Sequence, residues 1–169
     1  RVTFELHASS PVTNVTAAGS DDTLVTARFT GEPGGTVDVS AGPETRVRVR
    51  PRRAALPPML GRARWDVEVP RGVPLDLRVD GGSGPLTLDL LRTQLSSLEL
   101  DAGSGPTTVD LPGGGTPYRV ALDGGSGPID LRIAPGASVD MEADLSSGPT
   151  SIFIGEGSDV RLTLETGSG

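Results

Sequence analysis

The stretch Asp80-Gly81-Gly82-Ser83-Gly84-Pro85 recurs along the second half of the chain. Further copies begin at Asp101, Asp123 and Asp144, and a fifth, Glu165-Thr166-Gly167-Ser168-Gly169, stops before its proline. The serine of the motif recurs at spacings of 21, 22, 21 and 21 residues. Glycine and proline at fixed offsets are typical of ordered turns, so this period indicates a structural repeat of about 21 residues.

Apolar and polar residues alternate around each copy of the motif. Counting back from the first acid, the first, third and fifth residues are Val79, Leu77 and Leu75, with polar residues between them. Later copies follow the same pattern, with Ser96 as an exception, and the alternation resumes after each proline, first at Leu86. Period-two alternation predicts half-buried strands, so each repeat is interpreted as two strands and two turns.

A two-strand repeat cannot cover its own apolar face, so it must stack on its neighbours. The simplest all-β arrangement is a β-solenoid, in which equivalent strands pair in parallel about 4.8 Å apart. An antiparallel β-sandwich or meander is the alternative. The solenoid is favoured because stacked turns must match one another, whereas successive hairpin loops need not. It predicts an interior ladder made of Leu77, Leu98, Val120, Met141 and Leu162.

The first 64 residues are less regular. Short alternating stretches predict strands at residues 2–6, 12–17, 24–29, 36–39 and 46–50. We interpret residues 1–64 as degenerate repeats or a cap, and residues 65–169 as a regular array. Prolines between residues 51 and 63 interrupt any regular element. Trp65 is expected to be a buried cap over the first repeat, with a ligand platform as the alternative.

Charge is divided unevenly along the chain. Residues 1–64 carry nine Arg and six acids, whereas residues 65–169 carry six Arg and sixteen acids, within a net charge of −7. An acidic array is poorly suited to binding nucleic acid, which requires basic surfaces. The absence of cysteine excludes disulfides and thiol chemistry. No stretch approaches the roughly 18 apolar residues of a membrane-spanning helix.

The chain begins at Arg1 and stops inside a copy of the motif, which indicates a fragment or a processed form. The end of a solenoid leaves unpaired strand edges. We therefore expect either further residues or end-to-end self-association at the last repeat.

Two features are candidates for partner binding. Arg46, Arg48 and Arg50 alternate along one predicted strand, within a segment that holds seven of the fifteen arginines. They can form a basic patch for an anionic partner, or they can be the outward residues of an edge strand, where charge deters edge pairing. Phe153 interrupts an otherwise polar outward row and is the second candidate.

In a solenoid the acids of the motif would stack along one edge. Stacked carboxylates repel one another unless something offsets their charge. The structural interpretation is that each acid accepts hydrogen bonds from backbone N–H groups of its own turn. The alternative is Ca²⁺, which binds six to eight oxygen ligands. The acids in question are Asp80, Asp101, Asp123, Asp144 and Glu165.

The recurring D-x-G-S-G-P turns between short alternating strands resemble the toastrack, or putative-adhesin, family of bacterial β-strand-repeat domains of unknown function. The resemblance covers roughly residues 65–169, and residues 1–64 share only the general texture. It implies a stacked β-repeat fold, a bacterial source, frequent association with the cell envelope and links to stress responses. It implies no catalytic residues.

The sequence contains no catalytic signature. The acids are distributed along the repeats and not gathered, and the single histidine, His7, has no partner visible in the sequence. We therefore predict a non-enzymatic scaffold without a cofactor, which binds a protein or a cell-surface partner in the envelope or outside the cytoplasm. A cytoplasmic regulatory domain, a Ca²⁺-stabilised adhesion module and a carbohydrate-active β-helix enzyme remain as alternatives.

Overall fold

The computed structural model describes residues 1–8, 11–17, 23–31, 34–52 and 63–166. These residues form fifteen β-strands, and no helix occurs among them. The strands are β1 (Val2–Ala8), β2 (Val12–Thr16), β3 (Thr26–Thr30), β4 (Gly35–Ser40), β5 (Thr45–Pro51), β6 (Arg64–Glu68), β7 (Pro74–Gly81), β8 (Leu86–Asp89), β9 (Gln94–Asp101), β10 (Thr107–Leu111), β11 (Tyr118–Gly124), β12 (Ile129–Ile133), β13 (Ser138–Leu145), β14 (Thr150–Ile154) and β15 (Asp159–Thr166).

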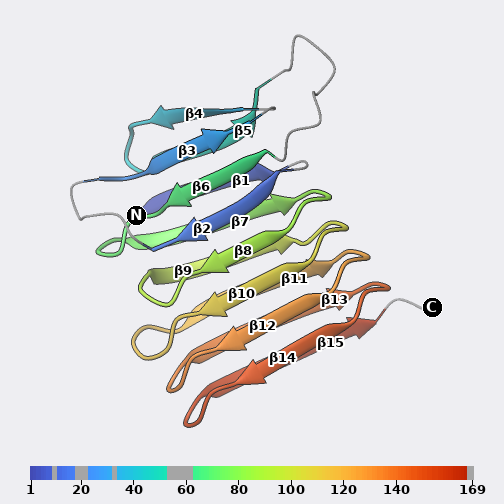
Figure 1. Cartoon of the computed structure of the whole chain (residues 1–169). Helices are drawn as coiled ribbons and strands as arrows, with labels where there is room; N and C mark the ends of the chain where they lie inside the picture. The colour runs from blue at the N-terminus through green and yellow to red at the C-terminus, as the bar shows by residue number, and fades with distance from the viewer. Residues whose placement is uncertain (9–10, 18–22, 32–33, 53–62, 167–169) are drawn as a thin grey trace.

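The strands form two sheets that face each other across a shared interior (Figure 1). One sheet has the order β15-β13-β11-β9-β7-β1-β5-β4, and the other has the order β14-β12-β10-β8-β2-β6-β3. All pairs are parallel except β3 with β6 and β4 with β5. The predicted solenoid of two-strand rungs is therefore confirmed, and antiparallel pairing is confined to the strands at one end of the stack.

The N-terminal rung lies inside the stack and not at its end. β1 pairs with β5 on one side and with β7 on the other, and β2 lies between β6 and β8. The chain therefore leaves β6, passes the rung made of β1 and β2, and re-enters the stack at β7. On this crossing the guanidinium of Arg71 donates a hydrogen bond to the carbonyl oxygen of Ala17, at 2.7 Å.

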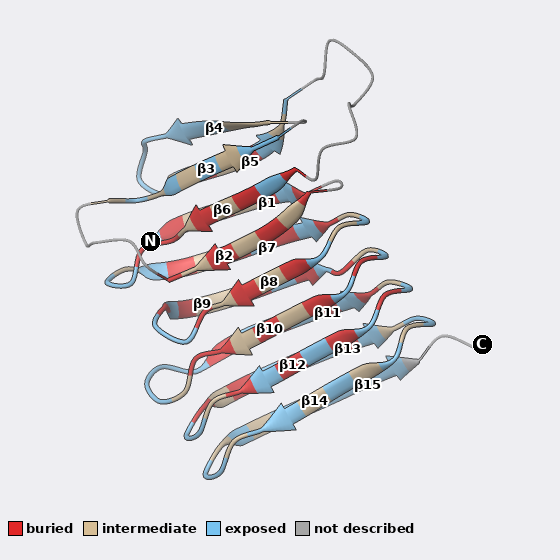
Figure 2. Cartoon of the chain, in the orientation of Figure 1, coloured by how far each residue is buried: buried red, intermediate tan, exposed pale blue. Residues whose placement is uncertain are grey.

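The interior ladder is continuous through the stack. The predicted order Leu77, Leu98, Val120, Met141 and Leu162 is confirmed by the strand register. The ladder extends beyond the repeats, because Phe4 lies between Leu77 and Val47. Each fully buried side chain of the ladder stabilises the fold by about 1.5–3 kcal/mol, and of the ladder only Leu162 is exposed. Figure 2 shows buried positions alternating with more exposed ones along the strands between the two ends of the stack, but not in the end strands β3, β4, β14 and β15.

Ser96 breaks the alternation because β9 contains a bulge. The register between β7 and β9 shifts after the pair formed by Leu75 and Leu95, so that Asp76 lies beside Ser97. Leu95 takes the buried position that strict alternation would give to Ser96. A bulge inserts one residue into a strand without turning the rest of its apolar face outward.

The glycines of the motif allow one turn to lie directly on the next. The backbone N–H of Ser104 donates to the carbonyl oxygen of Gly82 at 3.0 Å, and that of Ser126 donates to Gly103 at 3.1 Å. Gly103 has a φ of +65°, and a Cβ placed on it would lie 1.9 Å from the carbonyl oxygen of Gly81. A side chain at Gly103 would therefore collide with the preceding rung, and the same holds for the last glycine of the motif at Gly105, Gly127 and Gly148.

Trp65 lies on β6 and is fully buried, as expected for a structural role. A ligand platform would have to be exposed, so that alternative is wrong. Its ring packs edge-on against Phe29, with ring centroids 5.0 Å apart. Trp65 does not, however, contact the first regular repeat by strand pairing, because β2 separates β6 from β8.

Candidate functional site

The acids of the motif form the predicted ladder. The strand registers pair Asp80 with Asp101, Asp101 with Asp123, Asp123 with Asp144, and Asp144 with Glu165. β1 adds His7 to the same row, and its Nδ1 lies 3.2 Å from Asp80 Oδ2. Both of these side chains are exposed. This contact was not predictable from the sequence, because the two residues are far apart in the chain and meet only through the insertion of β1.

One carboxylate of the ladder accepts a hydrogen bond from the backbone of its own turn, as the structural interpretation of these acids requires. The backbone N–H of Gly103 donates to Asp101 Oδ1 at 3.1 Å, which closes an Asx-turn. Within the part of the chain that the structure describes, no three His, Asp or Glu side chains gather closely enough to hold a metal ion. The ladder is therefore a row of separate exposed carboxylates, and Ca²⁺ binding stays a prediction.

The three arginines Arg46, Arg48 and Arg50 lie on β5, which is not an edge strand. β5 lies between β1 and β4, and β4 forms the edge, so the edge-strand interpretation is wrong. Each arginine instead has an acidic partner on a neighbouring strand. Arg48 Nε donates to Glu5 Oε2 at 2.6 Å, Arg46 Nε lies 3.5 Å from Glu5 Oε1, and Arg50 binds Asp38 at 2.6 Å.

Glu5 is the best-sheltered acid of this cluster, with 16% of its side chain exposed. The hydrogen bond from Arg48 holds the pKa of the Glu5 carboxyl below its usual value, against the opposing effect of desolvation. These partners were not predictable from the sequence, because 43 residues separate Glu5 from Arg48. Their pairing leaves less free positive charge for an anionic ligand than the sequence indicates.

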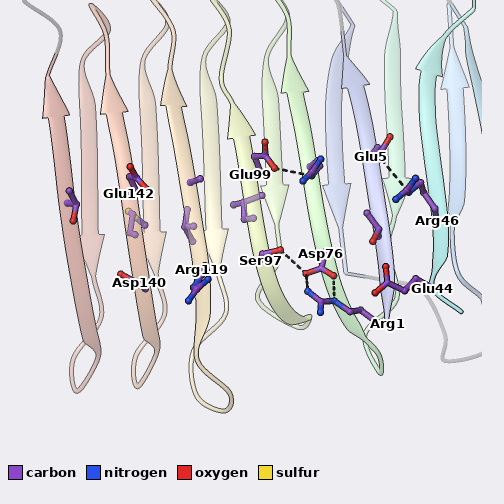
Figure 3. Close-up of a pocket in the computed structure, with 17 residues that line it drawn as sticks. Arg1, Glu5, Glu44, Arg46, Asp76, Ser97, Glu99, Arg119, Asp140 and Glu142 are labelled. Atoms are coloured by element: carbon purple, nitrogen blue, oxygen red, sulfur yellow. Dashed lines mark hydrogen bonds and ion pairs between the residues drawn. The ribbon is translucent and has the colours of Figure 1, made fainter.

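A shallow depression of about 650 Å³ runs over the outer face of the eight-stranded sheet (Figure 3). Within it, the guanidinium of Arg1 donates to Asp76, with Nη2 2.8 Å from Oδ1, and Ser97 Oγ donates to the same carboxylate at 2.7 Å. The hydrogen bond from Arg1 lowers the pKa of Asp76, against the effect of desolvation. Arg119 and Asp140 follow on the next strands. The depression thus presents charges of both signs, spread over several strands.

Tyr118 is the buried titratable group of the array. Its hydroxyl donates to the carbonyl oxygen of Pro112 at 2.7 Å, and burial raises its pKa to about 12. A hydroxyl that stays protonated and bonded to backbone at neutral pH is suited to fixing the loop before β11 and not to proton transfer.

The rung made of β14 and β15, here called the terminal rung, is the main exposed apolar surface of the array. Leu162 and Leu164 continue the interior ladders, yet they are 36% and 50% exposed. On β14, Ile154 is 51% exposed and the outward Phe153 is 57% exposed. The sequence identified Phe153 but missed the other three, because their alternation marks them as interior residues. β14 and β15 form the last rung that the structure describes.

Rungs stacked in parallel around one aliphatic interior define a β-repeat domain of the solenoid type. The sequence matches the family model described as the N-terminal domain of toast_rack, DUF2154, over residues 3–132, and the chain belongs to this family. The match takes in residues 3–64, where the sequence led us to expect only a general likeness, and extends through the array to residue 132.

One solved structure is similar over nearly its whole length. It is the crystal structure of a "putative cell adhesion protein" from Clostridium sporogenes, with a TM-score of 0.67 and 12% sequence identity, covering 99% of this chain and 93% of the other. At this identity the likeness shows the fold alone. No curated protein matches the sequence. No helix capable of crossing a membrane is present among the described residues.

Proposed function

We propose that this domain is a non-catalytic β-repeat scaffold of a bacterial envelope or stress-response protein, and that it acts by contacting a protein or a cell surface outside the cytoplasm. The observation that carries the proposal is Phe153, an aromatic side chain in the outward row of β14 that is 57% exposed. Aromatic residues are enriched at protein interfaces relative to the rest of the surface. The printed description of the Clostridium sporogenes protein points to the same kind of role.

The distribution of the polar residues also supports a scaffold. Catalysis by carboxylates needs acids that converge on one bond. In the described part of the chain, the acids lie in rows along the stack, and several are already in ion pairs with arginine. Neighbouring charges of opposite sign contribute a few tenths of a kcal/mol up to about 1 kcal/mol to sheet stability. Their arrangement is thus explained by the fold.

The test places a photo-cross-linking phenylalanine analogue at Phe153 in bacteria that produce the protein. Thr87 is the matched control, because it also faces outward on the seven-stranded sheet but lies in a central rung. We expect a protein adduct from position 153 in the envelope fraction, and much less from position 87. Equal adducts from both positions, or none from position 153, would contradict the proposal.

The acid ladder supports one second candidate, a Ca²⁺-stabilised adhesion module. Its five acids lie in register on one edge of the stack. Titration calorimetry and thermal melting with added Ca²⁺ test this candidate directly. Neither a heat of binding nor a Ca²⁺-dependent rise in the melting temperature is expected if the acids serve only their turns.

A further inference from the structure

We propose that the outer face of the eight-stranded sheet carries a binding site for acidic sugars, at the edge where β9, β11 and β13 begin. A depression of about 740 Å³ lies there, and Arg119 and Asp140 line both this depression and the one described above. A carboxylate of the sugar binds Arg119, and its hydroxyl groups bind Asp140 and nearby serines. The site lies on the sheet opposite Phe153 and does not depend on the proposed function.

The repeat departs from its regular geometry at two points beside this depression. In β9 the bulge inserts Ser96, which lines the depression. The strand registers pair Leu111 with Ile133 and Tyr118 with Val139, so the loop before β11 is one residue longer than the loop before β13. Bulges and other departures from a regular pattern are concentrated at functional sites. Both departures here lie at one place on the surface.

The longer loop is held in a fixed position. The hydroxyl of Tyr118 donates to the carbonyl oxygen of Pro112 at 2.7 Å, and the Tyr118 side chain is buried. Pro117, whose ring restricts its φ, follows in the loop and lines the depression together with Tyr118. A wall that is already fixed loses little conformational entropy when a ligand binds, which favours binding.

The charged groups of this depression do not pair with one another. Arg119 and Asp140 are neighbours in the register of β11 and β13 (Figure 3). Neither belongs to an ion pair within the part of the chain that the structure describes. Arg78 and Glu99, which are neighbours in the same way on β7 and β9, form an ion pair at 2.9 Å. Arg119 and Asp140 are therefore both available to a ligand.

The combination of charges and hydroxyls selects the class of ligand. The guanidinium of Arg119 can bind a carboxylate through two parallel hydrogen bonds. Asp140 and Asp159, in the same depression, accept hydrogen bonds from hydroxyls and repel a group with several negative charges, such as a phosphate. The hydroxyls of Ser96 and Ser138 can donate and accept. A sugar with a carboxylate and several hydroxyls satisfies all of these groups.

The row of outward residues also indicates how such a sugar lies. Arg161 on β15 shares a row with Arg119, and Asp140 lies between them. Strands are about 4.8 Å apart, so the two arginines are about 10 Å apart along the stack. A short chain of acidic sugars lying along the stack therefore meets an arginine, an aspartate and a second arginine in turn. Its carboxylates bind the arginines, and the hydroxyls between them bind Asp140.

The test is isothermal titration calorimetry of the whole chain with trigalacturonic acid at neutral pH and low salt. The fully methyl-esterified trisaccharide is the matched control ligand, because it keeps the ring hydroxyls but has no charge. We expect the acid to bind and the ester to bind at least about tenfold more weakly, since hydrogen bonds to charged groups are the stronger ones. No binding of the acid at millimolar concentration, or equal binding of the ester, overturns the site.

Two variants distinguish a built site from general attraction. Arg119→Gln should weaken binding at least about tenfold, whereas Arg132→Gln, which removes an outward arginine from the other sheet, should leave it unchanged. Asp140→Asn should weaken binding about threefold or more, because a carboxylate accepts stronger hydrogen bonds than an amide. General attraction predicts the opposite sign, since a negative charge is removed. Tighter binding by Asp140→Asn, or equal losses at the two arginines, overturns the site; thermal melting checks that each variant keeps its fold.

A peptide of three glutamates tests the competing class of ligand. It carries carboxylates without ring hydroxyls, so it should bind at least about tenfold more weakly than the trisaccharide, and equal binding overturns the assignment to sugars. The proposed function fails separately. An adduct at position 153 without sugar binding overturns this site alone, whereas sugar binding without the adduct supports this site and contradicts the proposed function.

Discussion

The two parts of the stack reach the same parallel pairing by different means. From β7 to β15 the rungs follow chain order, and each glycine turn lies on the one before it. From β1 to β6 the order is broken, since β1 and β2 lie between β5–β6 and β7–β8. Here no glycine motif sets the register. The aromatic pair of Phe29 and Trp65, and the hydrogen bond from Arg48 to Glu5, are specific contacts instead.

The difference shows that a rung can be specified either by its backbone or by its side chains. In the array, the last glycine of the motif, at Gly105, Gly127 and Gly148, leaves no room for a Cβ beside the preceding rung, so these turns stack in one phase. In the N-terminal region, particular side chains on strands distant in sequence recognise one another. Substitutions should therefore lower the free energy of unfolding most at side-chain contacts in the N-terminal region and at the glycine corners in the array.

The largest effect is expected from Trp65→Ala, which removes the bulkiest buried side chain of the N-terminal region. Truncation of a buried aromatic residue costs about 3–5 kcal/mol. Leu131→Ala, at a fully buried position of the array, is the comparison and should cost less, because a smaller volume is lost. Urea denaturation measures both. A larger loss at Leu131 would show that stability is concentrated in the array.

A smaller effect is expected at the turns. Gly103→Ala should cost about 3 kcal/mol, because the new Cβ meets the carbonyl oxygen of Gly81 in addition to the unfavourable φ. Gly114→Ala is the control: its φ is +68°, but nothing lies within 4 Å of the added Cβ, so only the backbone cost of about 1–2 kcal/mol applies. Equal losses of unfolding free energy would mean that turn stacking does not constrain the corner.

The ion pair of Glu5 should contribute about 1 kcal/mol, and Glu5→Gln should remove it. Because the pKa of Glu5 is lowered in the folded state from 4.5, this stabilisation is present above pH 4.5 and is lost as the pH falls through the folded-state pKa. The difference in unfolding free energy between the two proteins should therefore shrink in acid. Glu99→Gln, in an exposed pair with Arg78, should change stability by less than about 0.5 kcal/mol. A pH-independent difference at Glu5 would contradict the assignment.

The smallest effect is expected in the acid ladder. Asp123→Asn relieves repulsion from Asp101 and Asp144 and should raise stability by about 0.5 kcal/mol at low salt, with less gain at high salt. Asp101→Asn should raise stability less, because it weakens the hydrogen bond that the backbone N–H of Gly103 donates to this side chain. Melting temperatures at two ionic strengths provide the measurement. Loss of stability at Asp123, dependent on added Ca²⁺, would instead favour the metal site.

The regular part of the fold was predictable because its signal is local. The spacing of the motif and the alternation around it predicted the rungs, the interior ladder and the row of acids, all of which the strand registers confirm. The bulge was visible only as the anomaly of Ser96. In the N-terminal region the strands themselves were predicted, but their order in the sheets was not. Nothing near Phe4 in the chain indicates that it packs between Val47 and Leu77.

The contacts at the candidate surfaces were less predictable, because they too depend on the order of the strands in the sheets. The position of Arg48 beside Glu5 and that of His7 beside Asp80 depend on the placement of β1, which no local pattern encodes. Leu164 has the alternation of a buried residue, but it is 50% exposed because it lies on the last rung that the structure describes. Local sequence thus specifies which face a residue occupies, whereas its neighbours depend on the order of the strands.

The insertion of β1 and β2 also has a consequence for synthesis. β1 takes its neighbours from residues 45–49 and 75–81, so this strand cannot complete its pairing until residue 81 has left the ribosome. Contacts of such separation slow folding and leave edges exposed in the meantime. The later rungs can join one by one as they emerge. β1 must therefore wait for β7, and its pairing with both β5 and β7 joins the two parts of the stack.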